Sequence, residues 1–181
     1  MSDKKNWLAF GGSIAIIACF IILLFIPNPI TKAVFQPQAS KIIFPEQVMG
    51  MKLVSLISGE EAQKSVAGLH GLNIKLKEAY IGTYQSEKGS SAIIWVSESN
   101  NIAEAKKLFE IMDQKMPGNS FFTNYKRINY KGIDLRYVYW PKMNMHDYYY
   151  LIGTKNYWVA ITVDQDTNIF LDEVLQKFPA K

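Results

Sequence analysis

The sequence has 181 residues and is poor in the side chains that most enzymes use, with one cysteine, two arginines and two histidines. The single cysteine, Cys19, lies in an apolar N-terminal run, so the rest of the chain has no disulfide and no thiolate nucleophile. A serine hydrolase needs His70 or His146 as its base, and no G-x-S-x-G turn is present. Phosphate loops, dinucleotide fingerprints and haem attachment motifs are also missing. We therefore rank a hydrolase last, predict that the chain is not an enzyme, and expect no cofactor.

The positive charge is too dispersed to indicate nucleic-acid binding. The formal net charge is +4, and the lysines are dispersed along the chain with no block of five or more. Arg127 and Arg136 are the only arginines, whereas nucleic-acid interfaces carry a basic patch and favour arginine for bidentate phosphate contacts. No nucleic-acid partner is expected.

What the sequence does contain is one long apolar run at residues 7–27, WLAFGGSIAIIACFIILLFIP. As a helix this run would be about 31 Å long, enough to cross the hydrocarbon core of a bilayer. Lys4 and Lys5 precede it, and positive flanks stay in the cytoplasm. We expect a cytoplasmic tail over 1–6, a single membrane span over 7–27, and the remainder outside the membrane, in a periplasm or at the cell surface.

Two alternatives to a permanent anchor stay open. A cleaved signal peptide has a shorter apolar region that ends at small residues, whereas this run continues through residues 20–26. The residues IIAC at 16–19 resemble the lipobox of bacterial lipoproteins, in which the cysteine is lipidated. Here, however, Cys19 is followed by FIILLFIP rather than by a polar tether. As a small apolar residue inside a membrane helix, Cys19 needs no such role.

The region after the apolar run predicts a tether and then one domain. Pro29, Pro37 and Pro45 block regular structure, which predicts an extended tether over 28–50. Residues 51–181 have the length of one ordinary domain.

Hydrophobic periodicity divides this domain into hairpins and helices. We predict strands at 51–57, 75–85, 90–97, 126–131, 133–140, 147–152 and 157–163, and helices beginning at Ser58, at Ser99–Asn101 and at Asp164 or Asp166. Strands joined by tight turns are antiparallel. Paired strands separated by helices indicate an α+β fold, with about three helices packed on one face of an antiparallel sheet.

One short segment has the composition of a metal site. Met143, Met145 and His146 combine thioether and imidazole groups, which suit copper, especially Cu(I). His70 could supply a fourth ligand if the fold brought it close. The alternative interpretation is an ordinary surface turn after Pro141.

Aromatic residues are concentrated in the last third of the domain, where eight of the ten tyrosines lie between Tyr125 and Tyr157. Neighbouring strand residues point to opposite faces of a sheet, and helices on one face would leave the other uncovered. We expect this uncovered face to present some of Tyr137, Tyr139, Trp140, Tyr148, Tyr150 and Trp158. Exposed tyrosine and tryptophan are efficient contact residues for a partner protein, a glycan or lipid headgroups, although the same residues also stabilise sheets by pairing across strands.

The leading hypothesis from the sequence is a single-pass membrane protein with an extracytoplasmic binding domain. It would dock a partner protein, as an accessory subunit of a membrane complex, through the aromatic sheet face. The alternative is an extracytoplasmic copper-binding protein that uses Met143, Met145 and His146.

Overall fold

A computed structural model describes residues 44–70, 74–162 and 164–178. The predicted cytoplasmic tail, the membrane span and the tether up to residue 43 lie outside these residues. Among the helices that the structure describes, none is both long enough and apolar enough to cross a membrane.

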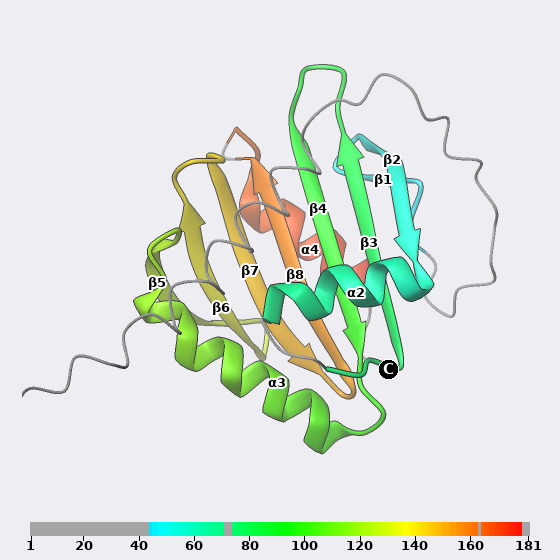
Figure 1. Cartoon of the computed structure of the whole chain (residues 1–181). Helices are drawn as coiled ribbons and strands as arrows, with labels where there is room; N and C mark the ends of the chain where they lie inside the picture. The colour runs from blue at the N-terminus through cyan, green and yellow to red at the C-terminus, as the bar shows by residue number, and fades with distance from the viewer. Residues whose placement is uncertain (1–43, 71–73, 163, 179–181) are drawn as a thin grey trace, which may run out of the picture.

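Eight strands form one antiparallel sheet in the order β1-β2-β3-β4-β8-β7-β6-β5 (Figure 1). The strands are β1 (Gln47–Val48), β2 (Met51–Ser58), β3 (Glu78–Gln85), β4 (Ser91–Glu98), β5 (Thr123–Tyr130), β6 (Ile133–Trp140), β7 (Met145–Ile152) and β8 (Lys155–Thr162). The predicted hairpins are present as β3–β4, β5–β6 and β7–β8. The two halves of the sheet meet where β4 pairs with β8, a contact between strands that are distant in the sequence.

Three helices accompany the sheet and confirm the predicted α+β class. They are α2 (Gly59–His70), α3 (Ile102–Lys115), which continues into the 3-10 turn η1 (Met116–Gly118), and α4 (Thr167–Lys177). Two of the predicted caps are present. The Asn101 side chain accepts a hydrogen bond from the Glu104 amide at 2.9 Å, and the Asp166 carboxylate accepts one from the Asn168 amide at 2.9 Å. Both caps satisfy amides that the first helical turn leaves without a partner.

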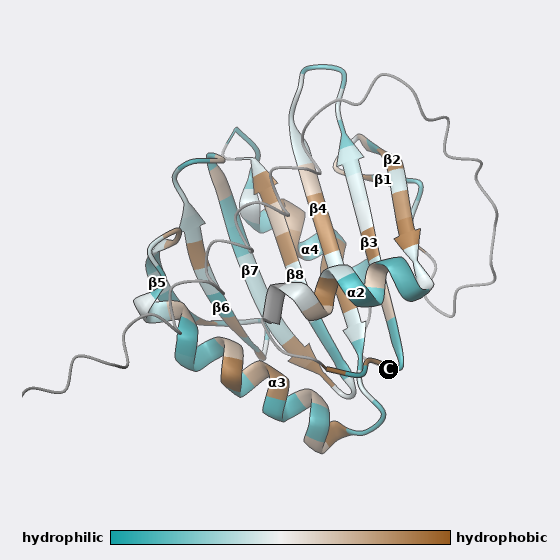
Figure 2. Cartoon of the chain, viewed as in Figure 1, coloured by the Kyte–Doolittle hydropathy of each residue, from teal (hydrophilic) through white to brown (hydrophobic). Residues whose placement is uncertain are grey.

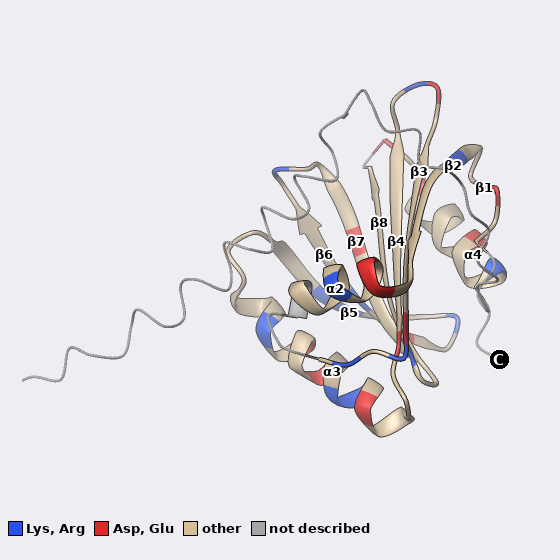
Figure 3. Cartoon of the chain, turned by 45° about the vertical axis from the view of Figure 1, so that its right-hand side comes forward, with Lys and Arg blue, Asp and Glu red and all other residues tan. Residues whose placement is uncertain are grey.

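The prediction that all helices pack on one face is wrong. Helices α2 and α3 cover one face of the sheet, and α4 covers the opposite face (Figures 1 and 3). On the first face, Val66 of α2 and Leu108 of α3 belong to one apolar cluster with Ile93 of β4. On the second face, Phe170 and Val174 of α4 pack against strands β4, β7 and β8.

The middle strands explain why both faces are covered. Every residue of β4 is buried, with Ile93 and Trp95 on the α2–α3 side and Ile94 and Val96 on the α4 side. In Figure 2 the brown apolar colour marks the middle of β4 and the half of β8 nearest its arrowhead. A strand that is apolar on both faces must be covered on both, because half of its side chains would otherwise face water.

The domain begins earlier than the sequence predicts. Residues 44–50 belong to the predicted tether, yet Phe44 and Val48 are buried in the core. Strand β1 pairs with β2, and the Lys177 amine of α4 donates a hydrogen bond to the Gln47 carbonyl at 2.7 Å. The segment therefore joins the edge of the sheet to α4.

Candidate functional site

Strand alternation divides the predicted aromatic face between the two sides of the sheet. Trp140 and Trp158 lie on the α2–α3 side, where both rings contact Phe122. Tyr148 and Tyr150 lie on the α4 side within the main core, and Tyr150 stacks on Tyr157.

Burial removes half of the six predicted contact residues from the surface. Trp140, Tyr148 and Tyr150 are buried, and Trp158 is partly buried. Tyr137 and Tyr139 remain partly exposed on the α4 side, where α4 does not bury them. Of the six residues expected from the sequence, Tyr137, Tyr139 and Trp158 stay partly exposed, and only the two tyrosines share the α4 side.

These two tyrosines form a small surface with His146 and Lys126, which we call the tyrosine–histidine surface. The Tyr137 hydroxyl lies 2.9 Å from Nδ1 of His146. The His146 ring centroid is 5.7 Å from that of Tyr137 and 5.8 Å from that of Tyr139. The Lys126 amine lies over the Tyr137 ring, 5.9 Å from its centroid, within the range of a cation–π contact. Adjacent strands β5, β6 and β7 supply all four side chains, so the sheet itself holds them in place.

The charge state of this surface follows from its partial burial. Burial lowers the pKa of His146 below its ordinary value, which favours the neutral ring at pH 7. With its proton on Nε2, the neutral ring accepts a hydrogen bond at Nδ1 from the Tyr137 hydroxyl. Burial also raises the pKa of Tyr137, so that hydroxyl stays protonated. Lys126 then carries the positive charge of the surface.

The predicted copper ligands do not converge. Met145 is buried on the α2–α3 side, whereas its neighbour His146 lies with Tyr137 on the α4 side. Met143 packs on the α2–α3 side with Met145. Alternation along β7 therefore separates the imidazole from both thioethers. The side chain of His70 lies outside the described residues, and the described part of the chain holds no group of three His, Cys, Asp or Glu side chains suited to a metal.

A buried carboxyl group that the sequence analysis did not single out lies on the other side of β7. Asp147 is 2% exposed, and its Oδ1 accepts a hydrogen bond from Nε1 of Trp158 at 2.7 Å. Burial raises the pKa of Asp147 to about 8, although the bond from Trp158 acts in the opposite direction. The signal in the sequence was an acidic residue on the apolar face of a strand, between Met145 and Tyr149.

A second acidic residue, Asp113 of α3, is held in a network of hydrogen bonds and ion pairs that stabilises the fold. It accepts hydrogen bonds from Nε of Arg136 and from the Tyr125 hydroxyl, both at 2.8 Å, and from Arg127 at 3.0 Å. Arg136 is buried and also pairs with Asp134. This network ties the end of α3 to β5 and β6, and all of its charges are paired.

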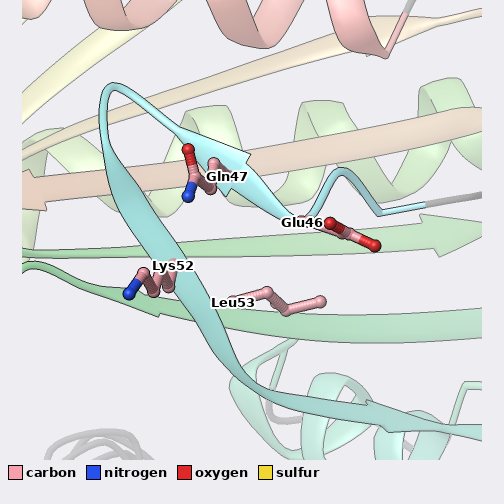
Figure 4. Close-up of a pocket in the computed structure, with 4 residues that line it drawn as sticks. All are labelled: Glu46, Gln47, Lys52 and Leu53. Carbon is pink, nitrogen blue, oxygen red and sulfur yellow. The ribbon is translucent and has the colours of Figure 1, made fainter.

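The described side chains that line the hollow at the edge of the sheet do not direct their charged groups toward a common point. It is lined by Glu46, Gln47, Lys52 and Leu53 of the β1–β2 hairpin (Figure 4). The side chains of Glu46 and Lys52 point away from each other in Figure 4, and Lys52 lies 3.9 Å from Glu87. The tyrosine–histidine surface is therefore the better candidate for binding.

In comparisons with known proteins, no family model, curated protein or solved structure matches this chain.

Proposed function

We propose that this chain is a single-pass membrane protein that holds its α+β domain outside the membrane and docks a partner protein through the tyrosine–histidine surface. The partner would be a component of a membrane complex, with this chain as a non-catalytic accessory subunit. The apolar run at 7–27, with Lys4 and Lys5 before it, supports the anchor and its orientation.

The observation that carries the docking proposal is the partial exposure of Tyr137, Tyr139 and His146 on the paired strands β6 and β7. Their neighbours on the same face, Tyr148 and Tyr150, are buried. Tyrosines held by a sheet lose little side-chain freedom on binding, and they combine a large apolar ring with a polar hydroxyl. Both properties are typical of the centre of a protein interface.

The charges around this surface favour a partner segment that carries carboxylates. Residues 123–144 contain five cations and one acid: Lys126, Arg127, Lys131, Arg136 and Lys142, with Asp134. Within the described part of the chain, acids pair with Arg127, Lys131 and Arg136, whereas Lys126 and Lys142 have no ion pair. An acidic segment would supply the missing partners, and such charge complementarity fixes orientation and speeds association.

The proposal can be tested by copurification of the full-length chain from native membranes in a mild detergent. We expect one stoichiometric partner, recovered by the natural chain and lost with Tyr139→Ala or Lys126→Glu. Truncation of a central interface tyrosine costs about 2 kcal/mol, which is about a thirtyfold loss of affinity. The loss should therefore be visible at moderate protein concentration.

Ile102→Ala is the matched control, because Ile102 is a 62% exposed apolar residue of α3 on the opposite side of the sheet. It should leave recovery of the partner unchanged. Recovery of the natural chain alone, or equal recovery of a partner by all the variants, would count against docking through this surface.

A further inference from the structure

Asp147 occupies an unusual position for an acid. Its Cα partners across the sheet are Val138 of β6 and Ala160 of β8, so apolar residues flank it on both sides. Oδ1 is bonded to Trp158, while Oδ2 is buried and has no hydrogen-bond partner among the described residues. Ionised carboxylates are normally paired when buried, because an isolated charge is poorly stabilised in an apolar core.

The surroundings of Asp147 contain no cation that is free to pair with it. The titratable and charged side chains on its face are Tyr149 of β7, Arg136 and Asp134 of β6, Tyr125 and Arg127 of β5, and Asp113 of α3, with Arg127 paired to Asp113. Arg136 is held by Asp113 and Asp134, and the Tyr149 hydroxyl donates to Asp113 at 3.2 Å. Trp158 of β8 is the only described side chain with a hydrogen bond to Asp147.

The rings around Asp147 connect the sheet to the helix layer. Trp158 stacks on Tyr149 at 5.3 Å between centroids, and Tyr149 in turn contacts Phe109 of α3 at 5.8 Å. Phe122, which follows η1, contacts both Trp158 and Trp140. A change at Asp147 therefore acts on the rings that hold α3 against β6–β8.

We propose that Asp147 is a proton-dependent switch of this core: the packed state holds a neutral carboxyl group, and loss of its proton loosens the contact between α3 and strands β6–β8. A neutral carboxyl group is tolerated in this apolar site. The carboxylate would need solvent or a counter-ion, and the site offers it only the indole N–H of Trp158.

The switch would also be felt on the opposite face of the sheet. A negative charge on Asp147 raises the pKa of Tyr137 and of Tyr148, in each case after the larger effect of burial. His146 precedes Asp147 on β7 and contacts Tyr137. This coupling to docking rests on the proposed function, whereas the pH dependence of the core does not.

Linkage gives the direction of the effect on stability. The ordinary pKa of an aspartic acid is 3.8, and the folded value here is about 8. Between these values the unfolded chain has lost a proton that the folded chain keeps, so unfolding releases one proton. The unfolding equilibrium constant should therefore rise by up to about tenfold per pH unit from about pH 4 to about pH 8, and level off above that.

The test compares the full-length natural protein with the full-length Asp147→Asn variant, both in detergent, from pH 5 to pH 9.5. Urea unfolding is followed by tryptophan fluorescence, and the protonation state of the carboxyl group is followed by infrared spectroscopy. We expect a protonated carboxyl band at pH 6 that disappears near pH 8 and is missing in Asp147→Asn. The same substitution should remove the rise in the unfolding constant. Hydrogen exchange in α3 and β6–β8, referenced to Asp147→Asn at each pH, should increase above pH 8.

Trp158→Phe provides a second variant if Asp147→Asn fails to fold. It removes the hydrogen bond that favours the ionised form, so the titration midpoint should rise. A missing carboxyl band at pH 6, or an unchanged midpoint in Trp158→Phe, would overturn the switch. If the core titrates as expected but partner recovery does not change with pH, the switch stands and its coupling to docking is excluded.

Discussion

The Phe44 ring lies directly on the backbone of Gly82 in β3. A Cβ atom on Gly82 would come within 2.5 Å of Cε1 of Phe44, too close for any real contact. The ring cannot simply move aside, because it packs edge-on against Phe178 at 5.0 Å and contacts Tyr80 at 6.2 Å. Phe44, the first described residue, therefore packs beside Phe178, the residue that caps the C-terminal end of α4.

Gly82→Ala should consequently destabilise the domain by about 1–3 kcal/mol, the usual cost of overpacking a well-filled core. Urea unfolding measures the effect. Gly68→Ala is the control, because Gly68 lies in α2 with open space around its Cα. That substitution should be neutral or should stabilise the helix by up to about 1 kcal/mol. Equal stability of Gly82→Ala and the natural chain would show that the Phe44 ring does not pack against Gly82.

Disruption of the network around Asp113 should lower the free energy of unfolding at least as much as Gly82→Ala does. Asp113→Ala would leave Arg136 buried with only the exposed Asp134 as a partner, which should cost about 3 kcal/mol. Glu110→Gln on the same helix is the control, since Glu110 makes only an exposed pair with Lys106 and should change stability little. A loss no greater than that of the control would mean that the network is not formed in solution.

Asp113 also predicts an acid-dependent loss of stability. Burial raises its pKa, but hydrogen bonds from Arg136 and Tyr125 and the charges of Arg136 and Arg127 outweigh burial and leave the pKa lowered. Its contribution to stability is present above the ordinary value of 3.8 and is lost as the pH falls through the folded value. Asp113→Asn should therefore narrow the difference in unfolding free energy between pH 6 and pH 2.5. An unchanged difference would contradict this assignment.

His146 should titrate below its ordinary pKa of 6.5, because burial disfavours its charged form. Nuclear magnetic resonance of the imidazole signals measures this directly. Tyr139→Ala exposes the ring and should move the pKa back towards 6.5, whereas Ile169→Ala, at an exposed position of α4, should not. Protonation of His146 should also lower stability as the pH falls below 6.5. A His146 pKa at or above 6.5 in the natural chain would contradict the burial.

The local features of the fold could be predicted from the sequence, but its layering could not. Asn101 and Asp166 were recognisable as caps, and alternating residues separated by turns indicated the hairpins. The pairing of β4 with β8 depends on contacts between residues such as Trp95 and Trp158. No local pattern specifies such a distant pair. In the structure the apolar run of β4 is buried on both faces, which accounts for the position of α4, but the sequence analysis placed all the helices on one face.

In the candidate site, too, local sequence patterns predicted some features, whereas others depended on how the elements pack together. Alternation correctly implied that Tyr148, Tyr149 and Tyr150 point to both faces, but a single sequence does not show which face the helices leave open. Met145 and His146 are adjacent in the chain, and a strand separates adjacent side chains, so the metal hypothesis required a loop where the structure has β7. Asp147 was indicated only by its charge within an apolar strand.

Docking through the tyrosine–histidine surface is tested most directly by photo-crosslinking in living cells. A photoreactive amino acid would replace Tyr139 in the full-length chain, with a second chain labelled at Ile102 on the opposite side of the sheet as the control. We predict a single major adduct from position 139, found in the membrane fraction and lost with Lys126→Glu, and no matching adduct from position 102. A chain that stays outside the membrane fraction with its first 30 residues intact, or the same adducts from both positions, would contradict the account.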